Sequence, residues 1–243
     1  MKYWVIIAAA GSGQRMKNST PKQYLPLGNK TVIECALAPF LENPQFEKVV
    51  VVIAENDFYW HGLTVTNHPK ILTAIGDNER YQTVLNGLAA LNAYASENDW
   101  VLVHDAARPL LTTSEIANLI KKLEGNNVGG LLAMPMFATV KQVDVENQVI
   151  ATIPRQHLWQ AATPQMFRYG VLTTALEAVV PEHVPSDCSQ AVEKLGYNPL
   201  IVECSQRNFK ITCPADLELA EKIVGACCAC PGTCNVPLHE DEN

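Results

Sequence analysis

Residues 3–15 read Tyr3-Trp4-Val5-Ile6-Ile7-Ala8-Ala9-Ala10-Gly11-Ser12-Gly13-Gln14-Arg15, an apolar run that passes directly into a glycine-rich loop. Such a run, bounded by turn residues, predicts a buried strand, and the glycines predict a turn into the next element. Farther along the chain, apolar runs alternate with segments of helical period. This alternation is the pattern of βαβ units, and it predicts an α/β fold with a mainly parallel sheet flanked by helices.

The expected strands are apolar runs between turn residues, and they cover 3–8, 48–54, 70–75, 100–104, 130–135, 200–204 and 208–212. The expected helices carry apolar residues at spacings of three and four, and they cover 31–41, 79–95, 114–124, 170–180 and 188–195. Ser114 is expected to cap the third of these helices. A last helix is expected to open at Pro214, because proline suits the first helical position and Asp216 suits the first turn.

The alternation of strands and helices breaks at 139–153, where polar and apolar residues alternate on both sides of Glu146-Asn147. This pattern predicts a β-hairpin. An isolated hairpin with so little apolar surface is only marginally stable in water, so we expect it to pack on something else, with a partner subunit as one candidate.

Composition limits the class of protein. A chain of 243 residues with 48% hydrophobic residues is long enough to bury a full core, and one domain is the default expectation. A net charge of -7 without a Lys/Arg run argues against nucleic acid as the partner. The apolar runs fall far short of the ~20 residues that cross a bilayer, and the N-terminus lacks the features of an export signal. The sequence predicts a cytoplasmic protein that does not span a membrane.

The glycine-rich loop is the first candidate site. Glycines allow backbone N–H groups to close around phosphate oxygens, and Arg15 and Lys22 add the positive charge that a polyphosphate needs. The loop matches neither the dinucleotide fingerprint nor the P-loop. An ordinary strand-to-helix turn is the alternative, and the two cations favour the phosphate site.

Asp105 is the second candidate, because it ends a predicted buried strand in the segment His104-Asp105-Ala106-Ala107-Arg108-Pro109. Open α/β sheets bind ligands at this edge, and a carboxylate there suits Mg²⁺ shared with substrate phosphates. The alternative is a carboxylate that caps the next turn and pairs with Arg108. His104 is interpreted as a structural residue.

Two further segments are ambiguous when each is taken alone. Residues 76–84 form a polar loop that feeds a helix, and such a loop either reads the edge of a base or simply caps the helix. Lys210 interrupts a predicted strand, and it either extends to solvent or reaches a phosphate.

In this order, the segments resemble the 2-C-methyl-D-erythritol 4-phosphate cytidylyltransferases of the non-mevalonate isoprenoid pathway, up to about Gly225. The resemblance implies a single Rossmann-like nucleotidyltransferase domain over 1–225 with a protruding β-hairpin arm at about 137–157. The implied reaction transfers CMP from CTP to 2-C-methyl-D-erythritol 4-phosphate, forming 4-diphosphocytidyl-2-C-methyl-D-erythritol and pyrophosphate.

The resemblance also implies roles for individual residues. Arg15, Lys22 and Lys210 are implied to be catalytic, and Asp105 to bind Mg²⁺. The positions implied to contact the nucleotide are Ala9, Ala10, Gly11, Gly13, Gly76, Asn78, Thr83, Ala106 and Arg108.

The acceptor side is implied to need two subunits. In the family, the arm exchanges within a homodimer and carries Thr139 and Arg155 to the acceptor phosphate in the neighbouring site. Ser186 and Asp187 match a Thr-Asp pair that contacts the polyol. Ala8, Thr83 and Ser186 depart from the common family residues but keep the required chemistry.

Two other functions remain open. A cytidylyltransferase for another polyol phosphate, such as ribitol 5-phosphate, would use the same fold, although Ala106-Ala107 favours the methylerythritol enzyme. A non-catalytic nucleotide-binding protein is the second, and the combination of Arg15, Lys22, Asp105 and Lys210 argues against it. A sugar-1-phosphate nucleotidyltransferase that uses UTP or GTP fits the motifs poorly.

The eight cysteines fall into two groups. Cys35, Cys188, Cys204 and Cys213 are scattered through predicted core elements and are expected to be reduced packing residues. The others crowd into 226–243, which is expected to be a disordered acidic tail. The alternative for this tail is a metal site formed by Cys227, Cys230, Cys234 and His239.

Overall fold

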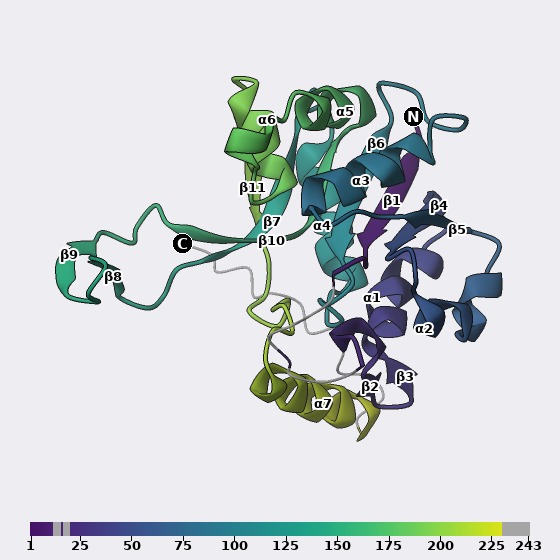
Figure 1. Ribbon diagram of the computed structural model, residues 1–243, viewed down its shortest axis with the longest axis horizontal. Helices are drawn as coiled ribbons and strands as arrows, with labels where there is room; N and C mark the ends of the chain where they lie inside the picture. Colours follow the sequence, from purple (N-terminus) through teal and green to yellow (C-terminus); the bar gives the residue numbers. More distant parts are fainter. Residues whose placement is uncertain (12–15, 17–19, 230–243) are drawn as a thin grey trace.

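A computed structural model describes residues 1–11, 16 and 20–229. Seven of the described strands form one sheet in the order β11-β7-β10-β6-β1-β4-β5 (Figure 1). All neighbours pair parallel except β10, which is antiparallel to both β6 and β7. The strands are β1 (Tyr3–Ala8), β4 (Phe46–Ile53), β5 (Ile71–Ile75), β6 (Trp100–Asp105), β7 (Gly129–Pro135), β10 (Trp159–Arg168) and β11 (Leu200–Glu203). The predicted mainly parallel α/β sheet is confirmed.

The sheet is covered on both faces, which explains why β1 is apolar throughout. Val5 and Ile7 pack with α1 (Val32–Leu41) and α4 (Thr113–Leu123) in one buried cluster. Trp4 and Ile6 point to the opposite face. There they pack with α3 (Arg80–Ala89), α5 (Tyr169–Glu177) and α6 (Cys188–Lys194).

Two of the helices begin with a capping box, in which the N-cap hydroxyl and a glutamate three residues later satisfy each other's backbone N–H groups. In α1 the pair is Thr31 and Glu34. In α4 the N-cap is Thr112, paired with Glu115, so the predicted cap at Ser114 is wrong by two residues. The helix predicted over 79–95 ends at Ala89 and continues as turns.

Two strand assignments differ from the prediction. The sequence did not indicate β10, because Pro164 in its middle argues against a central strand. The structure accommodates this proline where the pairing with β7 shifts register between Ala161 and Gln165. The strand predicted over 208–212 is wrong, since this segment joins no ladder; the Ile211 N–H donates to the Ala107 carbonyl at 2.8 Å.

Smaller elements complete the described chain. The last helix, α7 (Pro214–Ala229), opens at Pro214 as predicted and extends beyond residue 225. It packs on the ribbon of β2 (Pro26–Leu27) and β3 (Lys30–Thr31) (Figure 1). The remaining helices are α2 (Phe58–His61) and the 3₁₀ turns Lys22–Tyr24, Thr64–Asn67 and Pro181–His183. None of the described helices combines the length and apolar character that crossing a bilayer requires. The cytoplasmic location stays a prediction.

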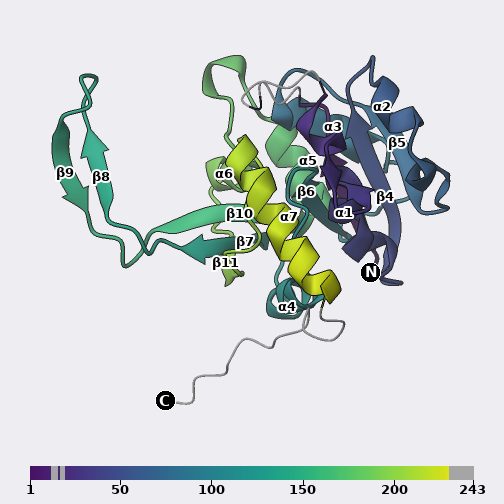
Figure 2. The ribbon, with the colours of Figure 1, turned by 90° about the horizontal axis from the view of Figure 1, so that it is seen from below.

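The predicted hairpin is confirmed as β8 (Val140–Val143) and β9 (Val149–Ile153), which pair only with each other in the described sheets. It projects away from the body as a separate arm (Figures 1 and 2). Four of its six Val and Ile side chains are exposed, with Val145 at 93% and both Val149 and Ile150 at 61%. The arm therefore has no apolar partner among the described residues of its own chain.

We predict that Gly130→Ala destabilises the fold. A Cβ at this position would lie 2.1 Å from the Leu200 carbonyl oxygen, so β7 and β11 would have to separate. Overpacking of this kind costs about 1–3 kcal/mol, measured as the free energy of unfolding in denaturant. Gly225→Ala is the control, because a Cβ there meets nothing within 4 Å. Equal stability of the two variants would contradict the prediction.

Candidate active site

A pocket of about 470 Å³ opens at the carboxyl ends of β1, β5 and β6. This is the edge where open α/β sheets bind ligands. The pocket is lined by Ala8, Ala9, Ala10, Gly11, Lys22, Gln23, Asp77, Asn78, Arg80, Thr83, Asp105, Ala106, Ala107, Lys210 and Thr212. Most of the residues singled out in the sequence for the nucleotide therefore gather in one place.

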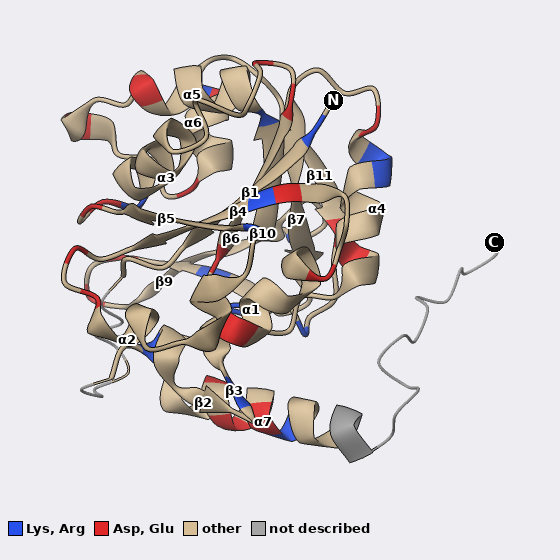
Figure 3. Cartoon of the chain, turned by 90° about the vertical axis from the view of Figure 1, so that its right-hand side faces the viewer, with Lys and Arg blue, Asp and Glu red and all other residues tan. Residues whose placement is uncertain are grey.

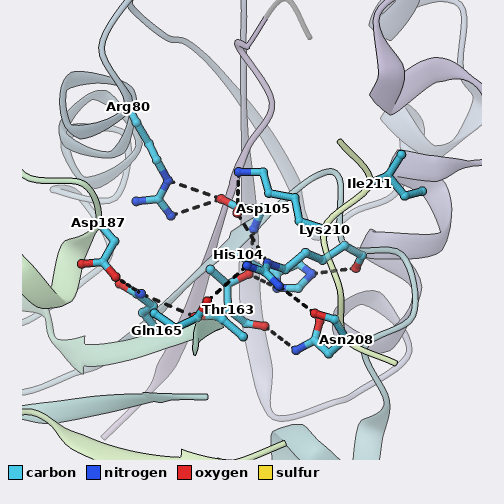
Figure 4. Close-up of polar contacts among 12 residues, drawn as sticks. Arg80, His104, Asp105, Thr163, Gln165, Asp187, Asn208, Lys210 and Ile211 are labelled. Atoms are coloured by element: carbon cyan, nitrogen blue, oxygen red, sulfur yellow. Dashed lines mark hydrogen bonds and ion pairs between the residues drawn. The ribbon is translucent and has the colours of Figure 1, made fainter. Parts of the chain in front are cut away.

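Asp105 is buried in the pocket wall between three cations (Figure 4). Its carboxylate lies 2.9 Å from Lys210 Nζ, 3.2 Å from Arg80 Nη2 and 3.6 Å from Arg108 Nε. Burial alone would raise the pKa of Asp105, but the three cations outweigh burial and hold this pKa well below its ordinary value. Asp105 therefore remains an ionised carboxylate at neutral pH.

The backbone at Asp105 is fixed from behind by a buried polar chain. The Asp105 N–H donates to Thr163 Oγ1 at 3.2 Å, and this hydroxyl lies 2.9 Å from His104 Nδ1. His104 Nε2 lies 3.1 Å from the Arg108 carbonyl, which only accepts, so Nε2 carries the proton and Nδ1 accepts from Thr163. Burial lowers the pKa of His104 to about 4, so the ring is neutral at physiological pH. His104 thus supports the site without lining it.

The start of the glycine loop is held by Gln23, a residue that the sequence did not single out. Its buried amide donates to the carbonyls of Ala9, at 2.8 Å, and Gly11, at 3.3 Å. Next to it, Lys22 Nζ donates to the Ile211 carbonyl at 2.8 Å, which brings this lysine beside the segment that carries Lys210. Gly13 and Arg15 lie outside the described residues.

The loop after β5 packs against the glycine loop. A Cβ on Gly76 would lie 2.6 Å from the Ala10 Cβ, so only glycine allows this close approach. Thr83 is buried, and its hydroxyl donates to the Asp77 carbonyl at 3.0 Å and accepts from the Asp77 N–H at 3.1 Å. These bonds fix the loop so that Asn78 borders the pocket.

Arg108 does not line the pocket but lies behind it. Its buried guanidinium donates to the Asn208 carbonyl at 2.7 Å, and the Asn208 amide donates to the Thr163 carbonyl at 2.8 Å. Through these bonds Arg108 ties the segment that carries Lys210 to the Asp105 turn. Its contact with a nucleotide remains a prediction.

Thr139 and Arg155 are not brought to the pocket of their own chain. Both are exposed at the base of the arm, where Arg155 Nη1 donates to the Phe137 carbonyl. Ser186 and Asp187 lie at the start of α6, beyond Arg80; the neighbouring Cys188 Sγ is 3.6 Å from Arg80 Nη1. Asp187 is the N-cap of α6 and accepts from the Gln190 N–H at 2.8 Å.

Arg80 was missed in the sequence, although it falls in the segment 76–84. The available signal was that Arg80 is the first residue of a helix that follows the carboxyl end of a strand. This position places Arg80 at the same edge of the sheet as Asp105. Nothing in the local pattern indicated that two cations, from α3 and from residues 208–212, would meet at one carboxylate.

The residues present fit a divalent cation held jointly with a ligand. The described residues contain no group of three or more His, Cys, Asp or Glu side chains able to hold a metal by themselves. Asp105 offers one ionised carboxylate beside a phosphate-binding loop, and Mg²⁺ commonly takes one carboxylate together with phosphate oxygens and water. Lys210 and Arg80 contact this carboxylate, and both side chains are partly exposed. Cys230, Cys234 and His239 of the predicted tail site lie outside the described residues.

In the cartoon of Figure 3, positions of Lys and Arg are interspersed with those of Asp and Glu along the described elements. At the pocket, by contrast, three cations lie within 4 Å of one carboxylate, Asp105.

Comparison with known proteins agrees with this geometry. Residues 3–226 match the family model described as 2-C-methyl-D-erythritol 4-phosphate cytidylyltransferase. The enzyme of that name from Pseudomonas putida is 47% identical over 218 residues, which cover 89% of this chain and 93% of the relative. The one from Tolumonas auensis is 43% identical over 223 residues, covering 91% and 96%.

A solved structure supports the same relationship. The 2-C-methyl-D-erythritol 4-phosphate cytidylyltransferase of Francisella tularensis superposes with a TM-score of 0.78 at 37% identity, covering 91% of this chain and 99% of the other. The chain therefore belongs to the 2-C-methyl-D-erythritol 4-phosphate cytidylyltransferase family.

Proposed function

We propose that the pocket transfers CMP from CTP to 2-C-methyl-D-erythritol 4-phosphate, a step in the synthesis of isoprenoid precursors. The observation that carries this assignment is the meeting of Lys22, Arg80 and Lys210 with Asp105 at the glycine loop. A triphosphate needs concentrated positive charge, and this pocket supplies it from three separate segments. The relatives named above act on the same acceptor, as their names state.

On the donor side, the backbone around Ala9, Ala10 and Gly11 would surround the triphosphate, together with Gly13 and Arg15. The loop that contains Gly76 and Asn78 would recognise cytosine, with Thr83, Ala106 and Arg108 near the nucleotide. The hydrogen bonds between Thr83 and Asp77, and the contact of Gly76 with the glycine loop, support this role for the loop.

The proposed reaction is an in-line displacement at the α-phosphorus of CTP. An oxygen of the acceptor phosphate forms the new P–O bond while the bond to the β-phosphate oxygen breaks, and pyrophosphate leaves with that electron pair. The nucleophile is already anionic, so the protein needs only to align it and offset charge. Lys22 and Lys210, with Arg15, would stabilise the negative charge that develops on the α-phosphate.

Asp105 would hold a divalent cation, most simply Mg²⁺, together with the phosphates of the nucleotide. Such an ion neutralises phosphate charge when bound. Arg80 and Lys210, released from Asp105, would then pair with phosphate oxygens.

The acceptor site would be completed by a second subunit in a homodimer. Ser186 and Asp187, beyond Arg80, would contact the polyol hydroxyls. Thr139 and Arg155 would reach the acceptor phosphate in the partner's pocket, because the arm carries them away from their own. The exposed apolar residues of the arm support an exchange in which each arm packs on the other subunit.

An assay of pyrophosphate release tests the function directly. Each of the four nucleoside triphosphates is combined with methylerythritol phosphate or ribitol 5-phosphate. We predict release with CTP and methylerythritol phosphate. Preference for ribitol 5-phosphate would support the alternative acceptor, and no release with any pair would support a nucleotide-binding protein without catalysis.

We predict that Lys22→Ala lowers kcat about 10²–10³-fold while CTP affinity changes much less, because its charge matters most in the transition state. Steady-state kinetics and equilibrium binding of CTP measure the two effects. Lys121→Ala, at an exposed position in the last turn of α4, is the control. A raised KM with an unchanged kcat would refute the assignment.

The shared site predicts complementation between two inactive variants. Lys22→Ala damages the pocket and Arg155→Ala damages the arm. A mixed dimer would then contain one site with both residues intact. After exchange of subunits, activity should recover to about a quarter of the wild-type value, because half of the dimers are mixed and each has one intact site. Sedimentation confirms the dimer, and absence of recovery in a dimeric mixture would show that each chain uses its own arm.

A further inference from the structure

Gln165 is a polar side chain in the apolar centre of the sheet. It lies on β10 and is only 1% exposed, and its cross-strand neighbours are Val103 of β6 and Leu131 of β7. A buried amide must find partners for its polar atoms, and Gln165 finds its two closest partners at the start of α6. Its Nε2 donates to Asp187 Oδ2 at 2.8 Å and weakly to the Ala162 carbonyl at 3.4 Å, and its Oε1 accepts from the Ser189 N–H at 3.0 Å.

These bonds fix the start of α6. Asp187 receives one hydrogen bond on each carboxylate oxygen, from Gln165 on Oδ2 and from the Gln190 N–H on Oδ1. A carboxylate oxygen accepts more than one bond, so both oxygens keep capacity for a ligand hydroxyl. Gln165 therefore sets the direction of this carboxylate without saturating it.

The place that Gln165 fixes borders the pocket. Asp187 is partly exposed, and Cys188, the next residue, contacts Arg80, which in turn contacts Asp105. In Figure 4, Asp187 and Gln165 lie on the same side of Asp105 as Arg80. On the same strand, Thr163 holds the Asp105 backbone. Strand β10 thus supports both Asp105 and Asp187.

Stability accounts for one of these bonds, because the Ser189 N–H lies in the first turn of α6, has no partner within the helix and is satisfied by Gln165 Oε1. Stability does not require the second bond, since the Asp187 carboxylate already caps the helix through the Gln190 N–H and is partly exposed to water. The second bond instead determines where a charged side chain at the edge of the pocket points.

We propose that Gln165 is a positioning residue for the acceptor, which acts by holding the Asp187 carboxylate toward the polyol hydroxyls. This inference rests on the proposed function and adds to it a residue that does not itself contact the substrate. Binding of CTP does not depend on Gln165, because the glycine loop and the loop at 76–83 are supported by other bonds.

The test is a double-mutant cycle on Gln165 and Asp187. Gln165→Met keeps length and volume but removes every hydrogen bond, so the acceptor KM should rise about tenfold while the CTP KM stays unchanged. Asp187→Ala should raise the acceptor KM by itself. The double variant should be no worse than Asp187→Ala, because Gln165 acts through Asp187. Gln45→Met, at an exposed position, is the matched control.

Hydrogen exchange gives a readout that does not use substrate. The Ser189 amide should exchange faster in Gln165→Met than in the wild type or in Gln45→Met, because it loses its acceptor. Gln165→Asn, which is too short to reach Asp187, replaces the Met variant if that variant does not fold, with the same expected changes.

An unchanged acceptor KM in a folded variant would overturn the inference. An equal rise in the KM for CTP and the KM for the acceptor would also overturn it. The same holds for a further tenfold rise in the acceptor KM when Gln165→Met is added to Asp187→Ala. The wild-type assay distinguishes failure of this inference from failure of the proposed function. An inactive wild type would overturn both. An active wild type with an unaffected variant would overturn only the role of Gln165.

Discussion

The ionised carboxylate of Asp105 is the interaction on which the rest of the pocket depends. A buried charge is costly unless it is paired, and Asp105 is paired with three cations from three parts of the chain: the first residue of α3, the turn after β6 and the segment after β11. The converse also holds, since three cations this close would repel one another without the carboxylate. Asp105 thus draws together segments that are far apart in sequence.

Strand β10 gives the pocket its second support and explains the arm. The strand runs antiparallel between β6 and β7, so the chain leaves the body along β7 and returns along β10. Residues 136–158 therefore connect two paired interior strands, and β8 and β9 lie within this connection. Both ends of the arm thus continue into strands that are paired within the sheet. Thr139 and Arg155 belong to this connection and do not line the pocket of their own chain, as the proposed site shared between subunits requires.

The sequence predicted the elements whose local pattern agrees with their final environment. β1 has the predicted bounds because both of its faces are buried, and α7 opens at Pro214 because proline suits that position. The prediction of elements from the sequence failed where contacts with residues distant in the chain override the local pattern. Pro164 sits in a central strand because the pairing shifts register around it, and 208–212 is held by Arg108 and Ala107 rather than by a ladder. Arg80 and Gln165 were missed because their partners lie 25 and 22 residues away, respectively.

The same arrangement explains how a concentration of positive charge is stabilised in the pocket. Lys210 and Arg80 reach Asp105 from opposite segments, and their side chains stay partly exposed on the pocket side. Asp105 therefore acts as their counter-ion in this structure. In the proposed reaction, phosphate oxygens would take over that role. Arg108 differs, because its guanidinium is buried and bonded to backbone carbonyls behind the pocket. Arg108 is thus fitted to hold the carboxylate in place, whereas Lys210 and Arg80 are the two cations that the proposed reaction would use on the ligand. This division follows from burial, because the Arg108 side chain is 9% exposed and those of Arg80 and Lys210 are 26% and 35% exposed.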